Sequence, residues 1–262
     1  MQHIIWNIDP ILLDFGVIKI RWYGLMFATG FVGSFLTMQW IYQRESKNVE
    51  ELDTLLWYMV VATIVGARLG HVLFYDPAYY LSHPLKILAI WEGGLASHGA
   101  AIGILTALYL YRRRFGDSYF WLLDRVTIPT ALAGALIRIG NFFNSEILGL
   151  PTQEPWGIIF ARVDPLPRHP VQLYEAFAYL VVYGICLQIY KKQADKPGFV
   201  FGSFLIMMFS VRFLLEYFKT EQAMYDTGLA LTAGQLLSIP FIVGGIACII
   251  RSLKNHPSKS VA

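Results

Sequence analysis

The residues best suited to chemistry lie in one stretch, Leu136 to Gly149, which runs LIRIGNFFNSEILG at the end of a long apolar segment. In a helix, Arg138 and Asn141 share a face because they are three residues apart, and Glu146 follows where the helix would end. An arginine offers a planar fork of N–H donors that suits phosphate, and asparagine amides add neutral donors and acceptors beside it. The stretch therefore predicts a binding site for an anion.

The composition indicates a polytopic membrane protein, because 56% of the 262 residues are hydrophobic and only 15% are charged. Seven apolar runs are each roughly 18 to 24 residues long, enough to cross a hydrocarbon layer of ~30 Å. The runs are about Ile20 to Tyr42, Thr54 to Tyr75, Gly94 to Tyr111, Phe120 to Phe143, Val171 to Tyr190, Phe199 to Phe218 and Leu231 to Ile250. We predict an all-α fold, with residues 1–262 forming a single transmembrane domain of seven helices.

Lysine and arginine are unevenly distributed between the segments that join these runs. If the N-terminus is outside, the inner segments hold eleven of these cations and the outer segments hold five. Cytoplasmic loops carry the excess in membrane proteins, so the N-terminus is expected to be extracytoplasmic and the C-terminus cytoplasmic. These cations are orientation signals, and no nucleic-acid partner is expected.

Two outer segments are expected to be ordered near the membrane surface. Residues 76–93 carry many aromatic and aliphatic side chains, which predicts an interfacial segment, such as a short amphipathic helix. Residues 145–170 contain five prolines, which disfavour a long helix and predict an extracytoplasmic cap.

Polar residues from separate segments gather at the outer end of this predicted topology. They are Tyr23, Arg68, His98, Arg138, Asn141, Glu146, His169, Glu175, Arg212 and Glu216. Arginines that only extend to the membrane surface would be expected at both faces, so one shared, partly hydrated cavity explains the clustering better.

Each of these residues also has a purely structural interpretation. Tyr23 has the position of an interfacial aromatic residue, and His98 can be a buried, hydrogen-bonded histidine or a group that exchanges a proton near neutral pH. Arg212 and Glu216 are four residues apart, which permits a salt bridge along one helix, although a ligand can also supply the anion that Arg212 needs. Gly66 and Gly70 form a GxxxG spacing that lets a neighbouring helix approach closely.

Six motifs together resemble the phosphatidylglycerol:prolipoprotein diacylglyceryl transferases of bacterial membranes, in that family's order and over almost the whole chain. They are WYG at Trp22 to Gly24, GARLGHV at Gly66 to Val72, HGAAIG at His98 to Gly103, RIGNFFNSEILG at Arg138 to Gly149, RHPVQLYE at Arg168 to Glu175, and RFLLE at Arg212 to Glu216. The chain departs from the family pattern at Ile137 and Ala100, where glycine is common. Neither departure removes a side chain that could do chemistry.

The resemblance implies a multi-pass protein of the bacterial inner membrane that acts on phosphatidylglycerol and on the signal peptide and lipobox of prolipoproteins. The implied reaction moves a diacylglyceryl group to the lipobox cysteine and releases glycerol phosphate. We expect Arg138 and Arg212 to bind the phosphate, Asn141 and Tyr23 to orient the headgroup, and Glu146 and Glu216 to hold the arginines. His98 is the candidate general base, although a carboxylate such as Glu146 or a positive field can also deprotonate a thiol. Arg68, Asn144, Gly149 and His169 are expected to support the headgroup site.

No metal, nucleotide or other cofactor is expected, because the sequence contains no P-loop, dinucleotide-binding turn or zinc-binding helix motif. Two alternative functions use the same arrangement of helices. A transporter or flippase for an anionic lipid or solute could bind its cargo with the same arginines, but no internal repeat is evident. A seven-helix receptor is a further alternative, although the last apolar run contains no lysine to hold retinal.

Overall fold

The computed structural model describes residues 3–16, 19–90, 93–220 and 231–255. Six of its helices are long and apolar enough to cross a membrane, as expected for a polytopic membrane protein. They are α1 (Trp22–Arg44), α2 (Glu50–Phe74), α5 (Tyr119–Phe143), α6 (Val171–Gln193), α7 (Phe199–Leu215) with its extension η3 (Glu216–Phe218), and α8 (Ala233–Asn255).

The remaining predicted span forms a seventh long helix, α4 (Ser97–Phe115), which is less apolar than the other six. Arg112, Arg113 and Arg114 all lie in its last turn. Any 18 consecutive residues of this 19-residue helix therefore include all three arginines. Arginines at a helix end can extend to the membrane surface, so their position is compatible with a span.

The chain divides into two compact units, which we describe separately. The smaller unit comprises residues 38–123, and the larger unit comprises residues 1–37 and 124–262. Helices α1 and α5 each contribute residues to both units.

In the smaller unit, α2 and α4 pack against each other through glycines. A Cβ atom on Gly70 would lie 2.7 Å from Cα of Gly99, and one on Gly103 would lie 3.2 Å from Cα of Gly66. Side chains at these positions would force the helices apart, so the GxxxG spacing of Gly66 and Gly70 does provide a close helix contact.

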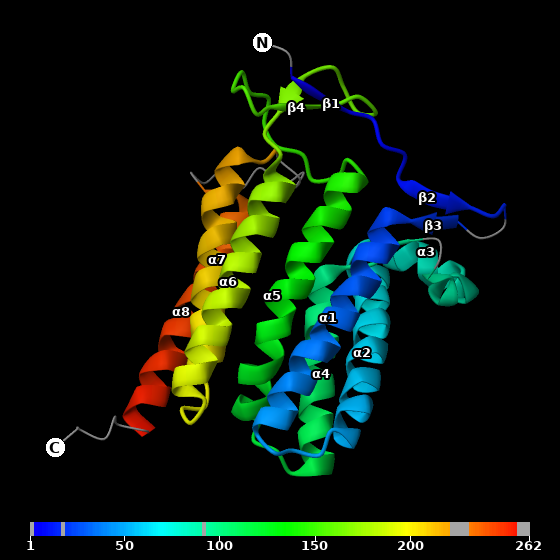
Figure 1. Cartoon of the computed structure of the whole chain (residues 1–262). Coiled ribbons are helices and arrows are strands. Elements are labelled where there is room, and N and C mark those ends of the chain that lie inside the picture. The colour runs from blue at the N-terminus through cyan, green and yellow to red at the C-terminus, as the bar shows by residue number, and fades with distance from the viewer. Residues whose placement is uncertain (1–2, 17–18, 91–92, 221–230, 256–262) are drawn as a thin grey trace. The chain divides into compact units, whose positions relative to one another are not determined.

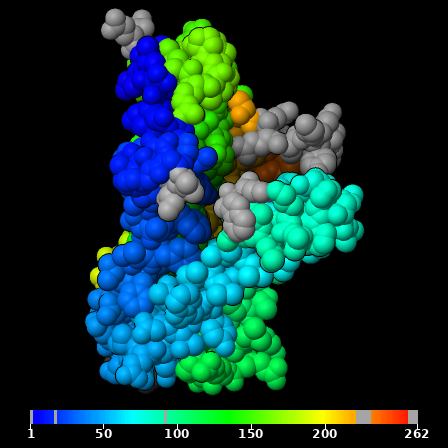
Figure 2. Space-filling model, turned by 90° about the vertical axis from the view of Figure 1, so that its right-hand side faces the viewer, coloured from blue at the N-terminus to red at the C-terminus, as the bar shows by residue number. Residues whose placement is uncertain are grey.

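The predicted interfacial segment begins with two short helices, α3 (Pro77–Ser82) and η1 (Pro84–Leu88). The Asp76 side chain accepts a hydrogen bond from the Tyr79 amide at the start of α3, and proline occupies the start of both helices. Leu81 and Leu85 are each 83% exposed, and Figure 2 shows this turquoise segment as a projection beside α2. Residues 91 and 92 of the predicted segment lie outside the described residues.

In the larger unit, a buried carboxylate fixes the start of α7. Asp124 on α5 accepts hydrogen bonds from the backbone amides of Gly198 and Phe201, at 2.7 and 2.8 Å. These amides have no partner within the first turn of the helix, so a carboxylate from another helix serves as their cap. Arg125 lies 3.8 Å from Asp124 and donates to the Ala194 carbonyl. The Asp124–Arg125 pair therefore joins α5 to the α6–α7 connection.

Three short strands form a small sheet beyond the ends of α5 and α6 (Figure 1). β1 (Ile4–Trp6) pairs in parallel with β4 (Ile158–Phe160), which pairs antiparallel with β5 (Pro167–Arg168). Phe142, Ile158 and Phe160 form a buried core beneath the sheet. A separate hairpin of β2 (Ile11–Asp14) and β3 (Lys19–Arg21) leads into α1. The proline-rich loop is therefore ordered and contains no helix, as its composition predicts.

The glycine contact between α2 and α4 gives a stability prediction. Replacing Gly99 with valine places a side chain against the Gly66 carbonyl and Gly70, which should destabilise the protein by about 1–3 kcal/mol through overpacking. Gly184→Ala is the matched control, because Gly184 lies in α6 with open space around it and alanine favours a helix. Thermal unfolding in detergent should show a lower midpoint for Gly99→Val only.

A carboxylate in the proline-rich loop gives a pH prediction. Hydrogen bonds from the Arg168 guanidinium lower the pKa of Asp164 below its usual value of 3.8. A pKa that is lower in the folded state stabilises the fold above the unfolded value and ceases to do so as the pH falls through the folded value. Asp164→Asn keeps an acceptor for the Leu166 amide but removes the charge. Its thermal midpoint should lie below that of the wild type at about pH 6, and the gap should narrow as the pH falls below the usual value of 3.8; a gap that does not narrow would contradict the assignment.

Candidate functional site

The polar end of α5 forms a connected set of hydrogen bonds. Arg138 Nη1 donates to Asn141 Oδ1 at 3.2 Å, and Asn141 Nδ2 donates to Glu146 Oε2 at 3.2 Å. Asn144 Nδ2 reaches the other oxygen of Glu146 at 3.1 Å. The side-chain amides of Asn141 and Asn144 therefore hold Glu146. The expected direct contact of Glu146 with an arginine is not formed among the described residues.

The turn after α5 holds Glu146 between two residues of unusual backbone conformation. Ser145 and Ile147 have φ angles of 57° and 55°, and a positive φ is rare for a β-branched residue. Surrounding contacts fix the turn, because Gln172 Nε2 on α6 donates to the Glu146 carbonyl at 2.6 Å. The Glu146 side chain is exposed, whereas Asn141 and Gln172 are buried. Such strained turns recur at binding sites.

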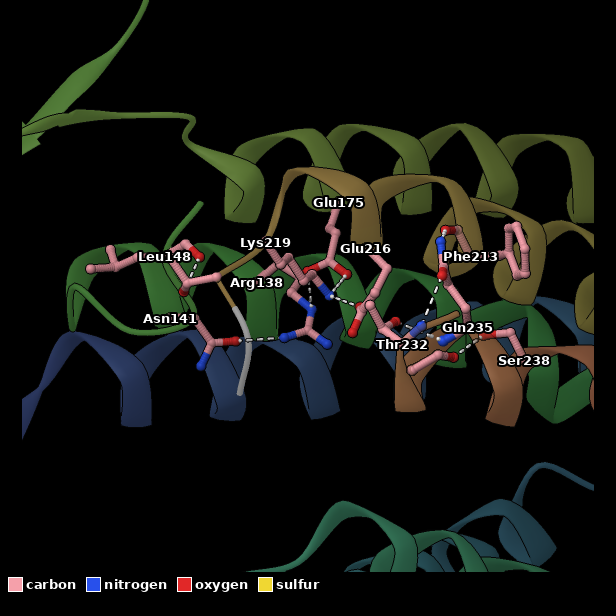
Figure 3. Close-up of polar contacts among 12 residues, drawn as sticks. Arg138, Asn141, Leu148, Glu175, Phe213, Glu216, Lys219, Thr232, Gln235 and Ser238 are labelled. Carbon is pink, nitrogen blue, oxygen red and sulfur yellow. Dashed lines mark hydrogen bonds and ion pairs between the residues drawn. The ribbon is translucent and has the colours of Figure 1, made fainter. Parts of the chain in front are cut away.

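A fully buried carboxylate lies between two cations at this end of the larger unit. Glu175 on α6 has no exposed surface; its Oε2 lies 3.0 Å from Arg138 Nε, and its Oε1 accepts a hydrogen bond from Lys219 Nζ at 2.8 Å. Figure 3 shows Glu175 facing both side chains. The Tyr179 hydroxyl is 3.4 Å from Glu175 Oε1 and also interacts with Arg138.

Glu216 pairs with Lys219, and the expected salt bridge to Arg212 is not formed. Lys219 Nζ lies 3.4 Å from Glu216 Oε2. The reason is local geometry: α7 ends at Leu215 and continues as the 3₁₀ helix η3, in which residues three apart lie above one another. A side chain on Gly234 of α8 would collide with the Glu216 carboxylate, so this glycine makes room for it.

Arg212 forms no ion pair with a carboxylate in the described part of the chain, whereas Arg138 and Lys219 both do. Its Nε is buried and has no hydrogen-bond partner among these residues. The Tyr179 phenol is within electrostatic range of both Arg212 and Arg138, so the two arginines act on the same region. Arg138 and Lys219 pair with Glu175, and Lys219 also pairs with Glu216, so Arg212 is the cation of this group whose charge is available to an anionic ligand.

Tyr23 lies beside the polar end of α5. A Cβ on Gly140 would be 2.9 Å from Tyr23 Cδ2, so the absence of a side chain at Gly140 admits the ring. The Tyr23 phenol is within electrostatic range of Glu146 and Arg138. Tyr23 therefore lies in the same region as Arg138 and Glu146.

His169 and Gly149 lie in the proline-rich loop and contact each other. A side chain on Gly149 would collide with the His169 carbonyl. The Gly149 carbonyl accepts a hydrogen bond from Arg168 Nη1 at 3.0 Å. His169 Nδ1 is 3.2 Å from the Tyr174 hydroxyl, and its ring packs against Phe218. These contacts assign packing to both residues, and none of them involves Arg138.

Arg68 and His98 belong to the smaller unit. Arg68 is 4% exposed and donates to the carbonyls of Lys86, Ile87, Gly93 and Gly94, with its guanidinium above the Tyr80 ring. Arg68 therefore holds the interfacial segment through backbone carbonyls. Its guanidinium donors are occupied by these carbonyls, whereas the sequence prediction assigned them to a lipid headgroup. His98 is the second residue of α4, and its side chain is exposed.

The sequence prediction placed Glu175 in the shared cavity but gave it no role, and it did not include Lys219 or Gln172. Gln172 and Glu175 were visible as a polar pair on one face of an apolar helix, which is a signal of function in a membrane span. Lys219 resembled an ordinary outer cation, because nothing in its spacing indicates a partner 44 residues away.

Comparisons with known proteins identify the family of this chain. The family model described as prolipoprotein diacylglyceryl transferase matches residues 10–251. A phosphatidylglycerol–prolipoprotein diacylglyceryl transferase of Tolumonas auensis is 51% identical over 252 residues, covering 95% of this chain and 98% of the relative. The protein of the same name from Chloroherpeton thalassium is 48% identical over 257 residues, covering 97% and 96%. This chain belongs to the prolipoprotein diacylglyceryl transferase family.

Proposed function

We propose that this protein transfers the diacylglyceryl group of phosphatidylglycerol to the cysteine thiol of a prolipoprotein lipobox. Membership of the transferase family supports the reaction class. The observation that carries the assignment to particular residues is the buried Arg212 Nε, which has no acceptor among the described residues and lies in the same region as Arg138, because the reaction needs positive charge where a phosphate departs.

The reaction is a displacement at carbon. A cysteine thiolate attacks the glyceryl carbon that bears the phosphate, a C–S bond forms, and the C–O bond to phosphate breaks. The bond electrons leave with glycerol phosphate, and the thiol proton goes to a base. Negative charge thus builds on the phosphate in the transition state, so fixed cations there accelerate the reaction.

Arg138 and Arg212 are the residues assigned to this phosphate. Arg138 is held by Asn141 at Nη1 and by Glu175 at Nε, which leaves part of its fork of donors for a ligand. Arg212 has a buried Nε that lacks an acceptor among the described residues, and a phosphate oxygen would supply one. Asn141 and Tyr23 are placed beside Arg138 to orient the headgroup.

His98 is the candidate base for the thiol, with Glu146 as the alternative. Glu146 has an exposed carboxylate held by two amides, which is compatible with proton transfer as well as with support. Asn144 supports Glu146, while Gly149 and His169 shape the loop that follows it. Arg68 holds the interfacial segment within the smaller unit.

The proposed location is the bacterial inner membrane, with α4 as the seventh span, the N-terminus outside and the C-terminus inside. In this topology the site faces the outer leaflet, and the loop over residues 145–170 is an extracytoplasmic cap. The excess of lysine and arginine in the inner segments supports this orientation. Both substrates are held in the membrane and can reach the site laterally.

Replacing Arg138 with alanine should lower kcat/KM for transfer by about 10²–10³-fold, because a donor to the developing charge is lost. Glycerol phosphate release from phosphatidylglycerol, with a lipobox peptide as acceptor, measures the effect. Arg138→Lys is the matched variant: it keeps the charge without the planar fork and should recover only part of the activity. Near-normal turnover of Arg138→Ala protein that is correctly inserted would contradict the phosphate role.

Replacing His98 with glutamine should lower kcat by roughly 10²–10⁴-fold if this histidine is the sole base. Measuring kcat for a Glu146→Gln variant in the same assay compares the two candidate bases. Substantial activity in His98→Gln, together with a large loss in Glu146→Gln, would transfer the role to the carboxylate.

A transporter or flippase for anionic lipids is the alternative function. Purified protein in vesicles of phosphatidylglycerol distinguishes the two when a lipobox peptide is added. Covalent modification of the peptide and release of glycerol phosphate support the enzyme. Movement of lipid between leaflets without either product supports the transporter.

A further inference from the structure

Glu175 lies where helix α6 meets two cations from different parts of the larger unit. Its side chain has no exposed surface, its neighbour Gln172 is equally buried, and the side chain of Lys219 is only 7% exposed. A carboxylate in such surroundings is costly unless cations compensate its charge. Arg138 and Lys219 provide that compensation from opposite oxygens.

The position of Lys219 is fixed by backbone pairing with the turn after α5. Gly149 and Lys219 form an antiparallel β-bridge, the Leu150 amide donates to Phe218 at 2.8 Å, and the Thr220 amide donates to Leu148 at 3.2 Å. Thr220 also donates its hydroxyl to the Leu148 carbonyl at 2.9 Å. The ammonium group is thus delivered to Glu175 by a structured segment.

Glu175 contacts Arg138 at Nε, and Asn141 accepts from Nη1 of the same guanidinium. Two fixed contacts on a planar group determine the direction of its remaining donors. We propose that Glu175 is a positioning residue that orients Arg138 toward the phosphate of phosphatidylglycerol, and that Lys219 offsets the charge of Glu175 so that Arg138 remains an effective cation. The proposal rests on the proposed transferase function and assigns roles to two residues that do not themselves react.

Three variants separate orientation from charge. Glu175→Gln leaves Arg138 and Lys219 as unbalanced neighbours, so both the thermal midpoint and kcat should fall, the latter by roughly 10- to 100-fold because Arg138 loses its direction. Lys219→Met keeps Glu175 on Arg138 but removes positive charge, so KM for phosphatidylglycerol should rise more than kcat falls. The double variant Glu175→Gln/Lys219→Met has the wild-type net charge without the orienting carboxylate.

The full-length protein is assayed in detergent with phosphatidylglycerol at varied concentration and a lipobox peptide, and kcat, KM and thermal midpoint are measured for each variant. We expect the double variant to recover the thermal midpoint while its kcat stays at the level of Glu175→Gln. Lys19→Met is the control, because Lys19 pairs with Asp14 at 3.1 Å on the surface and both side chains are 47% exposed. Its kcat, KM and midpoint should equal those of the wild type.

Recovery of wild-type kcat in the double variant would overturn the positioning role, since charge balance alone would then suffice. A kcat for Glu175→Gln within twofold of the wild type would overturn it as well. If Glu175→Gln does not fold, the double variant decides the question. These outcomes leave the proposed function intact, whereas wild-type protein that releases no glycerol phosphate would refute that function and the inference with it.

Discussion

The arrangement of the site depends on the ion pairs of a carboxylate that has no access to solvent. The buried Glu175 side chain on α6 can be charged only because Arg138 lies beside its Oε2 and Lys219 beside its Oε1. This requirement links α5, α6 and the end of α7, since each supplies one member of the group. Removing one member would leave an uncompensated charge, so the three side chains form one structural unit that also carries the positive charge of the site.

The sequence predicted the helices and the polar end of α5 well, because both follow from local periodicity. Arg138 and Asn141 are hydrogen-bonded at the predicted spacing, and six of the seven predicted spans are helices with the length and composition of membrane spans. Partners at long range could not be predicted. The carboxylate that pairs with Arg138 comes from Glu175 on α6. Helical spacing permitted a salt bridge between Arg212 and Glu216, but the helix changes to a 3₁₀ helix after Leu215, and Glu216 pairs with Lys219 instead.

Arg68 shows a second reason why the sequence was insufficient. An arginine within an apolar run indicates an anionic partner, and the expected partner was a lipid headgroup. In the structure its acceptors are backbone carbonyls of the segment that follows α2. Every residue has a backbone carbonyl, so the pattern of side chains in the sequence does not indicate which carbonyls will accept from an arginine. The charge is therefore used to hold the interfacial segment against α2 within the smaller unit.

The bridge between Gly149 and Lys219 has a consequence for how this chain can vary in length. An added residue between Glu146 and Gly149 would place a different amino acid opposite Lys219 and would set a side chain against His169, where only glycine fits. The number of residues in this turn is therefore constrained. By contrast, Gln153 to Trp156 are exposed, and insertions there would leave the bridge unchanged. Length differences among related chains are expected to be concentrated at that exposed tip.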